Sequence, residues 1–410
     1  MGKGQLRALV AILALVVAAL LCARSMRGTP QAVGASSGVS AGLPPTETLQ
    51  LERTRVFAFP APNGFRGGVQ CDARGDAFVQ FTVLVGDPMH LAPFPSISEV
   101  IPNEKRIVAY ITPQLPESKY PHAAVISYGV SPGGKLYALM FARRITSKGN
   151  PLSAVKYYVE RFKHDGTSGS ITPVPAPAGV AHWYADQLVP FPDGGFLVVG
   201  EATTAKERPS LGSWGPLTAI YDSTGRFVRE VTLPHDVTNN FNERVAGKPR
   251  AAGRARAQAS RVPQGFEAAI STGGVFSGPD GNVWILRASS PIRLYAVDSA
   301  GQVIQHFEIS PPAPGLIPFG FGVARPGEIF LDFLRPPPSN PGAASGPSKG
   351  PSEFIGVFNS ISGQFDALYT LPKVRNAFLG TIACSDGDSG FLYLGSTSGN
   401  RLAVFDLAPR

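Results

Sequence analysis

Short hydrophobic runs of four or five residues, separated by turns rich in Gly, Pro and Asp, recur along most of the chain. The clearest copy spans residues 277–312, with a turn at 278–282, strands expected at 283–286 and 293–297, a second turn at 298–301 and a last strand. Runs of this length bounded by turn residues are typical of β-strands joined by tight turns. The pattern predicts an all-β fold.

This unit repeats with a period of about 60 residues. The first turns of successive units lie at 72–75, 131–134, 192–195, 279–281, 325–327 and 386–388. A second turn, clearest at 221–225 and 297–301, follows most of them, and the strand after it usually ends at a proline. Four short strands with two tight turns make a β-propeller blade, so the sequence predicts six such blades.

The sixth unit is one strand short, because the sequence ends soon after the strand expected at 401–406. Residues 53–60 resemble the fourth strands of the other units and end in proline as they do. Pairing this segment with the C-terminal unit removes two free sheet edges. The sequence thus predicts a six-bladed β-propeller of four-stranded blades, with its ring closed by an N-terminal strand that joins the C-terminal blade.

Two motifs carry a family resemblance: Gly-Pro-Asp-Gly-Asn-Val-Trp at 278–284 and the Tyr-Asp-x-x-Gly turn at 221–225. They resemble the motifs of NHL-type six-bladed propellers, a broad group that is also similar to lactonase-like and streptogramin-lyase-like propellers. The resemblance covers about residues 49–410 and implies the fold alone, because these residues build blades. The His-x-x-Glu pattern of lyase-like propellers is not recognisable, so no catalytic residue is carried over.

The N-terminus carries Lys3 and Arg7, then an uncharged apolar run from Ala8 to Ala23, then Arg24. This run is long for a signal-peptide core and short for a spanning helix. Residues 1–27 are therefore expected to form a signal peptide or a signal anchor, and the position of Arg24 favours the uncleaved anchor.

The next segment, residues 28–48, is rich in Gly, Ser, Ala and Pro and is expected to form a flexible linker to a propeller domain at 49–410. Either interpretation of the N-terminus places the propeller outside the cytoplasm. The expected location is the periplasm or the cell surface, with the chain anchored at its N-terminus or secreted.

The formal net charge is +8, and much of it comes from one connection, residues 235–264. Arg250, Arg254 and Arg256 lie there among Ala and Gly, with no acidic residue after Glu243. The run either contacts an anionic partner, such as lipid head groups or polysaccharide, or is a solvated insert. No aromatic side chain interleaves these charges for base stacking, which together with export argues against nucleic acid.

Long connections gather on one face of the predicted ring, which we call the long-loop face. They lie at 86–96, 143–154, 201–216, 235–264 and 335–353. The turns of the opposite face are tight. Loops on a rigid scaffold usually carry binding, so the long-loop face and the mouth of the central channel are the expected working surface.

His122 and His182 each lie ten residues before the proline of a first turn. Both are expected to begin the innermost strands of neighbouring blades at the channel mouth, with Tyr184 and Glu267 nearby. His122, His182 and Glu267 would suit an acid–base site or a divalent metal whose identity the sequence leaves open. The alternative is that both histidines are hydrogen-bonded structural residues.

Cys71 and Cys384 each end the first strand of a unit, in two units that become neighbours when the ring closes. Export permits a disulfide between them. Inner strands of adjacent blades can lie too far apart for the required Cα separation, so a pair of buried thiols is the other interpretation.

The sequence has no His-Glu-x-x-His motif, no Cys-x-x-Cys motif and no phosphate-binding Gly loop. We therefore expect a non-enzymatic, membrane-tethered propeller that binds a protein or glycan partner through its long-loop face. The alternative hypothesis is a metal-dependent hydrolase or lyase with its site at the channel mouth.

Overall fold

The computed structural model describes residues 45–48, 51–58, 65–81, 95–111, 122–143, 155–204, 214–234, 273–288, 291–314, 316–334, 353–370, 382–385, 390–395 and 401–407. The chain divides into two compact units, residues 1–37 and 38–410, and every described residue lies in the second. Within the described ranges, no helix has the length and apolar character needed to cross a membrane. The segment expected at 1–27 and the basic run of 235–264 lie outside these ranges.

Four sheets are each built from four consecutive strands. The first contains β3 (Phe65–Cys71), β4 (Ala77–Phe81), β5 (Pro95–Ile101) and β6 (Arg106–Ile111). The second contains β7 (His122–Val130), β8 (Leu136–Arg143), β9 (Val155–Phe162) and β10 (Ser168–Val174). The third contains β11 (His182–Pro190), β12 (Phe196–Thr203), β13 (Gly215–Tyr221) and β14 (Phe227–Glu230). The fourth contains β15 (Gly273–Ser277), β16 (Val283–Arg287), β17 (Ile292–Val297) and β18 (Val303–Ile309).

The remaining two sheets each include a strand from the N-terminal part of the chain. The fifth contains β19 (Ile317–Arg325), β20 (Glu328–Leu334), β21 (Glu353–Asn359) and β22 (Gln364–Thr370), with β1 (Thr46–Thr48) added to it. The sixth contains β23 (Ile382–Ser385), β24 (Gly390–Gly395) and β25 (Arg401–Leu407), with β2 (Leu51–Ala58) beside β25.

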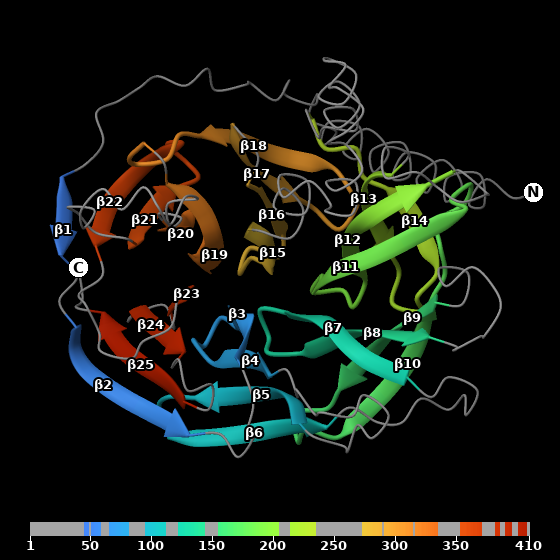
Figure 1. Ribbon diagram of the computed structural model, residues 1–410, viewed down its shortest axis with the longest axis horizontal. Helices are drawn as coiled ribbons and strands as arrows, with labels where there is room; N and C mark the ends of the chain where they lie inside the picture. The colour runs from blue at the N-terminus through green and yellow to red at the C-terminus, as the bar shows by residue number, and fades with distance from the viewer. Residues whose placement is uncertain are drawn as a thin grey trace, which may run out of the picture. The chain divides into compact units, whose positions relative to one another are not determined.

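The sheets are arranged around a common centre (Figure 1). Consecutive strands pair antiparallel within each sheet, as short strands joined by turns must. The innermost strands are β3, β7, β11, β15, β19 and β23, and each of the first five contacts the innermost strand of the sheet that follows it along the chain. Four-stranded antiparallel blades of this kind confirm the predicted all-β propeller fold.

The sequence predicted four strands in every sheet, and one sheet has five. Five sheets have four strands, and one has five because β1 pairs parallel with the outer edge of β22, Thr46 opposite Leu368. An edge strand presents unpaired N–H and C=O groups, which a neighbouring extended segment can satisfy. Residues 46–48, at the end of the expected flexible linker, occupy that edge as a strand.

The last sheet combines strands from both ends of the described chain. β2 pairs antiparallel with β25 along most of its length, with Val56 opposite Ala403 and a register shift between Leu51 and Arg53. The innermost strand of this sheet, β23, contacts β3 of the first sheet.

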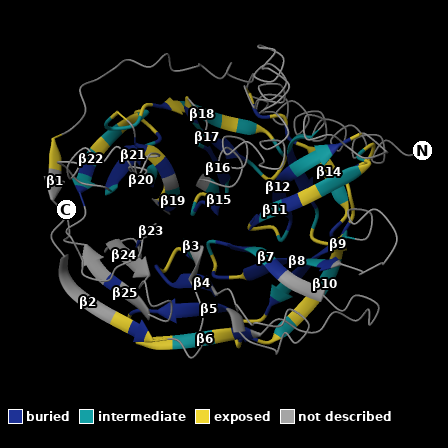
Figure 2. Ribbon diagram, in the orientation of Figure 1, coloured by how far each residue is buried: buried dark blue, intermediate teal, exposed yellow. Residues whose placement is uncertain are grey.

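The hydrophobic core lies between neighbouring sheets. One cluster joins Val189 and Leu197 of the third sheet to Val283 and Ile285 of the fourth. β16 is buried along its whole length because both of its faces are covered, which explains its continuous hydrophobic sequence. Figure 2 shows mostly buried positions on the inner strands and exposed ones along outer strands such as β6 and β18.

The repeated turns are held by their own aspartates, as the turn between β13 and β14 shows. Asp222 Oδ1 accepts hydrogen bonds from the N–H groups of Thr224 (2.8 Å) and Arg226 (3.0 Å) and from the Thr224 hydroxyl (2.6 Å). The hydrogen bond from the Thr224 hydroxyl, with those from the backbone, lowers the pKa of Asp222 to about 2. Gly225 has a φ of 81°, a conformation that favours glycine. The Tyr-Asp-x-x-Gly motif therefore encodes a turn.

Candidate functional site

The two histidines singled out by the sequence begin neighbouring inner strands, as expected. His122 is the first residue of β7 and His182 is the first residue of β11, and the two strands are in contact. The side chain of His122 and the whole of Glu267 lie outside the described part of the chain. His182 is half-buried and lies opposite Thr203 of β12.

A β-bulge follows His182 in the innermost strand of the third sheet. The register between β11 and β12 shifts between Ala185 and Gln187, so that Asp186 has no opposite residue in the ladder. The backbones of β11 and β12 lie close together here, and glycine at position 200 of β12 permits this. A Cβ at that position would overlap the Tyr184 carbonyl oxygen. Bulges of this kind redirect side chains and are frequent beside functional sites.

Tyr184 is the most exposed large side chain of β11. It has 47% of its surface exposed, although it belongs to an innermost strand. The preceding residue, Trp183, packs edge-on against Tyr157 of β9 with ring centroids 4.7 Å apart, which fixes the backbone of the strand. Burial raises the pKa of Tyr157, and the nearby Tyr184 and Asp186 raise it further. Tyr184 is therefore held on a rigid base with a carboxylate close by.

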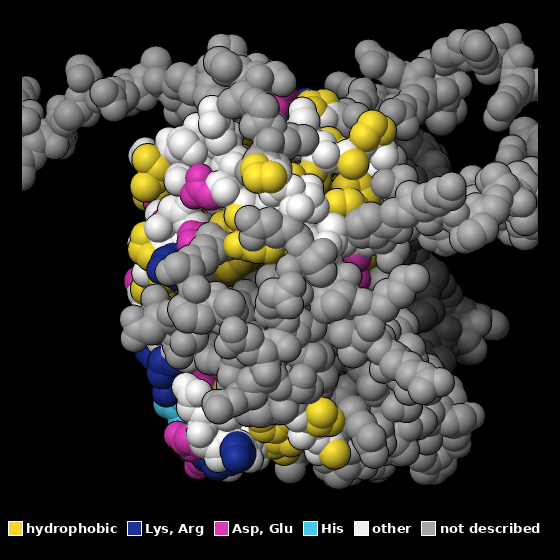
Figure 3. Space-filling model, turned by 90° about the vertical axis from the view of Figure 1, so that its left-hand side faces the viewer, with side chains coloured by type: hydrophobic (Ala, Val, Ile, Leu, Met, Phe, Trp, Pro, Cys, Tyr) yellow, Lys and Arg dark blue, Asp and Glu magenta, His cyan; other side chains and the backbone are white. Residues whose placement is uncertain are grey.

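A second exposed hydrophobic residue lies at the corresponding end of another inner strand. Ile317, the first residue of β19, is 46% exposed. By contrast, the side of the molecule drawn in Figure 3 shows described hydrophobic side chains in small groups among polar ones. Scattered exposed hydrophobic residues are normal on a protein surface. Tyr184 and Ile317 differ from them because both lie near the start of an innermost strand.

The expected metal or acid–base site is not assembled by the residues that the structure describes. Among them, no group of three His, Cys, Asp or Glu side chains is arranged to hold a metal ion. Of the expected ligands, only the side chain of His182 is described. The proposed anionic-partner residues Arg250, Arg254 and Arg256 also lie outside the described ranges.

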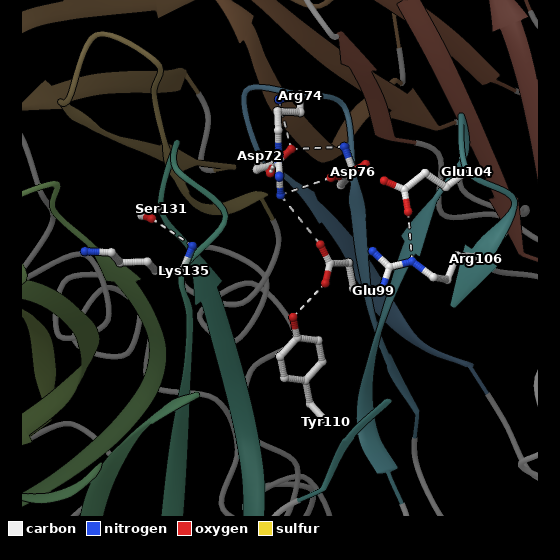
Figure 4. Close-up of polar contacts among 9 residues, drawn as sticks. All are labelled: Asp72, Arg74, Asp76, Glu99, Glu104, Arg106, Tyr110, Ser131 and Lys135. Atoms are coloured by element: carbon white, nitrogen blue, oxygen red, sulfur yellow. Dashed lines mark hydrogen bonds and ion pairs between the residues drawn. The ribbon is translucent and has the colours of Figure 1, made fainter. Parts of the chain in front are cut away.

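A cluster of buried carboxylates at the first turn of the first sheet was not predicted (Figure 4). Asp72 Oδ1 accepts hydrogen bonds from the N–H groups of Arg74 (2.9 Å) and Asp76 (3.0 Å), and its Oδ2 contacts Arg74 Nε at 2.9 Å. Arg74 Nη2 lies 3.1 Å from Asp76 Oδ2 and 3.8 Å from Glu99 Oε1. The Tyr110 hydroxyl donates to Glu99 Oε2 at 2.6 Å. The Asp-Ala-Arg-Gly-Asp sequence was the available signal, and it was interpreted as a turn alone.

One arginine balances three carboxylates in this cluster. Asp72, Asp76 and Glu99 are buried, whereas the side chain of Arg74 is 60% exposed. Burial raises the pKa of Asp76 to about 7, and the negative charge of Asp72 adds to this effect while Arg74 opposes it. The cluster packs against the second sheet, because the Ala73 N–H donates to the Pro132 carbonyl at 3.1 Å.

The cysteines that end β3 and lie in β23 are joined. A disulfide links Cys71 to Cys384, with a Cα–Cα distance of 5.9 Å. The distance falls within the usual range for a disulfide, so the two inner strands approach more closely than the alternative of separate thiols assumed. The bond connects the first and sixth sheets directly before their first turns.

Comparison with known proteins yields no family. No family model matches the chain, and no curated protein matches it. A crystal structure of a protein of unknown function from Dyadobacter fermentans DSM 18053 is similar, with a TM-score of 0.48 and 10% identity, covering 88% of this chain and 99% of that chain. The Hadza microbial sialidase Hz136 gives a TM-score of 0.46 and 10% identity, covering 84% of this chain and 65% of that chain. Similarities at this level carry no argument about activity, and the NHL-like resemblance is not confirmed.

Proposed function

We propose that this chain is an exported, membrane-tethered β-propeller that binds a protein or glycan partner, without catalysis, through the end of the ring where the inner strands begin. We regard its six sheets as six blades in a ring closed by β2, with β1 as an addition to the fifth. The observation that carries the proposal is the exposure of Tyr184 on an innermost strand whose other residues are buried or half-buried.

The chemistry around Tyr184 supports contact with a partner. An exposed tyrosine on a rigid strand loses little conformational entropy when it is covered, and its ring contributes a large apolar area with a polar tip. His182 and Asp186 lie on the same strand, each within two residues of Tyr184.

No described contact favours the alternative of a metal-dependent hydrolase or lyase. Its ligand set requires His122 and Glu267 beside His182, and of these only the His182 side chain is described. The binding function is therefore the one that we propose.

The test is a capture experiment with the full chain immobilised through its C-terminus. Envelope extract and an array of defined glycans are applied to the native chain, to Tyr184→Ala and to Ile361→Ala. Ile361 is 85% exposed in the turn between β21 and β22, so its removal controls for general loss of a surface hydrophobic residue. We expect the native chain and Ile361→Ala to retain the same partner and Tyr184→Ala to lose most of it. Equal capture by all three chains would overturn the proposal.

A further inference from the structure

Buried acidic groups concentrate between the first and second sheets. Asp76 and Glu99 of the first sheet lie in the carboxylate cluster that packs against the turn at 131–135. Glu160, in β9 of the second sheet, is fully buried. It lies two residues from both Tyr158 and Phe162, which pack in the cluster that joins these two sheets, so alternation along the strand places it on the same face.

Glu160 lacks a compensating charge among the described residues. Neither of its carboxylate oxygens has a partner at hydrogen-bonding geometry within the described part of the chain. Its neighbours across the sheet are Ala138 of β8 and Ile171 of β10, both apolar. Burial raises the pKa of Glu160 to about 7, and the side chain of Ser168 offsets only part of this effect.

Asp76 faces more negative than positive charge. The groups that act on it are Asp72, Glu99 and Glu104, opposed by Arg74 alone. Glu104 is itself exposed and paired with Arg106 at 2.9 Å. From the second sheet, Lys135 is the nearby cation, and Figure 4 shows its side chain turned away from the carboxylates.

Tyr110 connects the carboxylate cluster around Asp76 to the strand that carries Glu160. Its hydroxyl donates to Glu99 in the carboxylate cluster, and its ring packs edge-on against Phe162 at 5.3 Å between centroids. Phe162 follows Glu160 on the same strand face. A change in charge at either place therefore acts on the same packed interface.

We propose that the interface between the first and second sheets is a proton-dependent joint, tight when Asp76 and Glu160 are protonated and weakened when both are ionised. Each carboxyl titrates at a higher pH in the folded chain than in the unfolded chain, where ordinary pKa values near 4 apply. The unfolded chain therefore binds fewer protons than the folded chain between about pH 4 and pH 7. The contribution of these two groups to the free energy of unfolding is fully present below about pH 4 and is lost as the pH rises through 7.

The test is hydrogen exchange of the full chain at pH 5.5 and pH 8, corrected for the intrinsic exchange rate. Peptides covering 95–111 and 155–162 report on the joint, and peptides covering 283–297 report on the fourth sheet. We expect protection at the joint to fall relative to the fourth sheet on the order of tenfold, the effect of one pKa unit. An equal change in both sheets, or no change, would overturn the proposal whether or not any variant folds.

Neutral variants sharpen the test. Asp76→Asn with Glu160→Gln keeps the shape of both side chains and removes their titration, so the difference between the sheets at pH 8 is expected to disappear. Glu308→Gln is the matched control, because Glu308 pairs with Arg293 at 3.1 Å in the fourth sheet with half of its side chain exposed. Retention of the pH response by the double variant would also contradict the proposal.

Discussion

The two ends of the sheets are built in different ways. At one end, which we call the tight-turn end, each turn satisfies its own backbone groups, as Asp222 and Gly225 do between β13 and β14. At the other end the two inner strands whose first side chains are described, β11 and β19, begin with the partly exposed residues His182 and Ile317. The difference separates residues that hold the ring together from residues that remain available for contact.

The recurring Asp- and Gly-bearing motifs stabilise the fold and do not mark the surface proposed to bind a partner. The most conspicuous pattern in the chain, the Asp- and Gly-bearing turns, belongs to the tight-turn end and has a structural role. Tyr184, which carries the functional proposal, belongs to no repeated motif. Substitutions at the tight-turn end should therefore reduce stability, whereas substitutions at the other end should reduce binding.

The largest expected effect is the loss of the disulfide at the tight-turn end. Cys71→Ala with Cys384→Ala removes a cross-link between residues 313 positions apart. In the chain-entropy account, the free energy of unfolding falls by about 5 kcal/mol. Denaturant unfolding of the variant measures this loss, with Cys22→Ala, a change of the third cysteine, as the control. A loss below about 1 kcal/mol would show that the sixth and first sheets are held together by other contacts.

A single glycine at a tight turn comes next. Gly225→Ala places a Cβ against Thr172 Cγ2 and 2.7 Å from the Pro173 carbonyl oxygen, in a conformation with φ of 81°. We expect a loss of about 2–3 kcal/mol, from strain and overpacking together. The matched control is Gly215→Ala in β13, where no heavy atom lies within 4 Å of an added Cβ. Equal melting temperatures for the two variants would contradict the role assigned to the turn.

Asp222→Asn should have a smaller effect that appears on changing the pH. The pKa of Asp222 is lowered from its ordinary value near 3.8 to about 2, so its ionised form stabilises the fold above pH 4 and this contribution is lost as the pH falls toward 2. The native chain is expected to lose more stability between pH 5 and pH 2.5 than Asp222→Asn does. Thermal unfolding across this range gives the comparison, and parallel curves for the two chains would exclude the effect.

The smallest effect on stability is expected at the other end. Tyr184→Ala removes an exposed side chain that fills no core space, so the free energy of unfolding should change by no more than about 0.5 kcal/mol. Denaturant unfolding of this variant beside the native chain checks the value. A loss above about 2 kcal/mol would mean that Tyr184 is a structural residue, because only buried or networked side chains have such effects.

The sequence was sufficient to predict the strands and turns because local residues determine them. Asp-x-x-Gly turns and short hydrophobic runs indicated β16 and β17 to within one residue of their bounds, and the position of His182 at the start of β11 followed from the same spacing. The pairing of β1 with β22 could not be predicted, because residues 46–48 have no pattern that specifies a partner. Edge pairing depends on which edge lies within reach in three dimensions.

The buried polar groups and the disulfide between sheets could not be predicted from local sequence patterns either. Glu160 lies in the run Tyr-Tyr-Val-Glu-Arg, where alternation alone does not show that the neighbouring sheet covers it. The disulfide was left open because its formation depends on the distance between two inner strands, which no local pattern determines. Tyr184 was identified only by its nearness to His182, and its exposure became evident in the structure.

The most direct test of the functional account is the dissociation constant of the captured partner for the native chain, Tyr184→Ala and Ile361→Ala, with all three confirmed to be equally stable. Truncation of a central aromatic contact commonly costs about 2 kcal/mol of binding free energy or more, a weakening of roughly thirtyfold. The account predicts this weakening for Tyr184→Ala and an unchanged constant for Ile361→Ala. Equal weakening in both variants, or weakening in Ile361→Ala alone, would contradict it and transfer the binding surface to the tight-turn end.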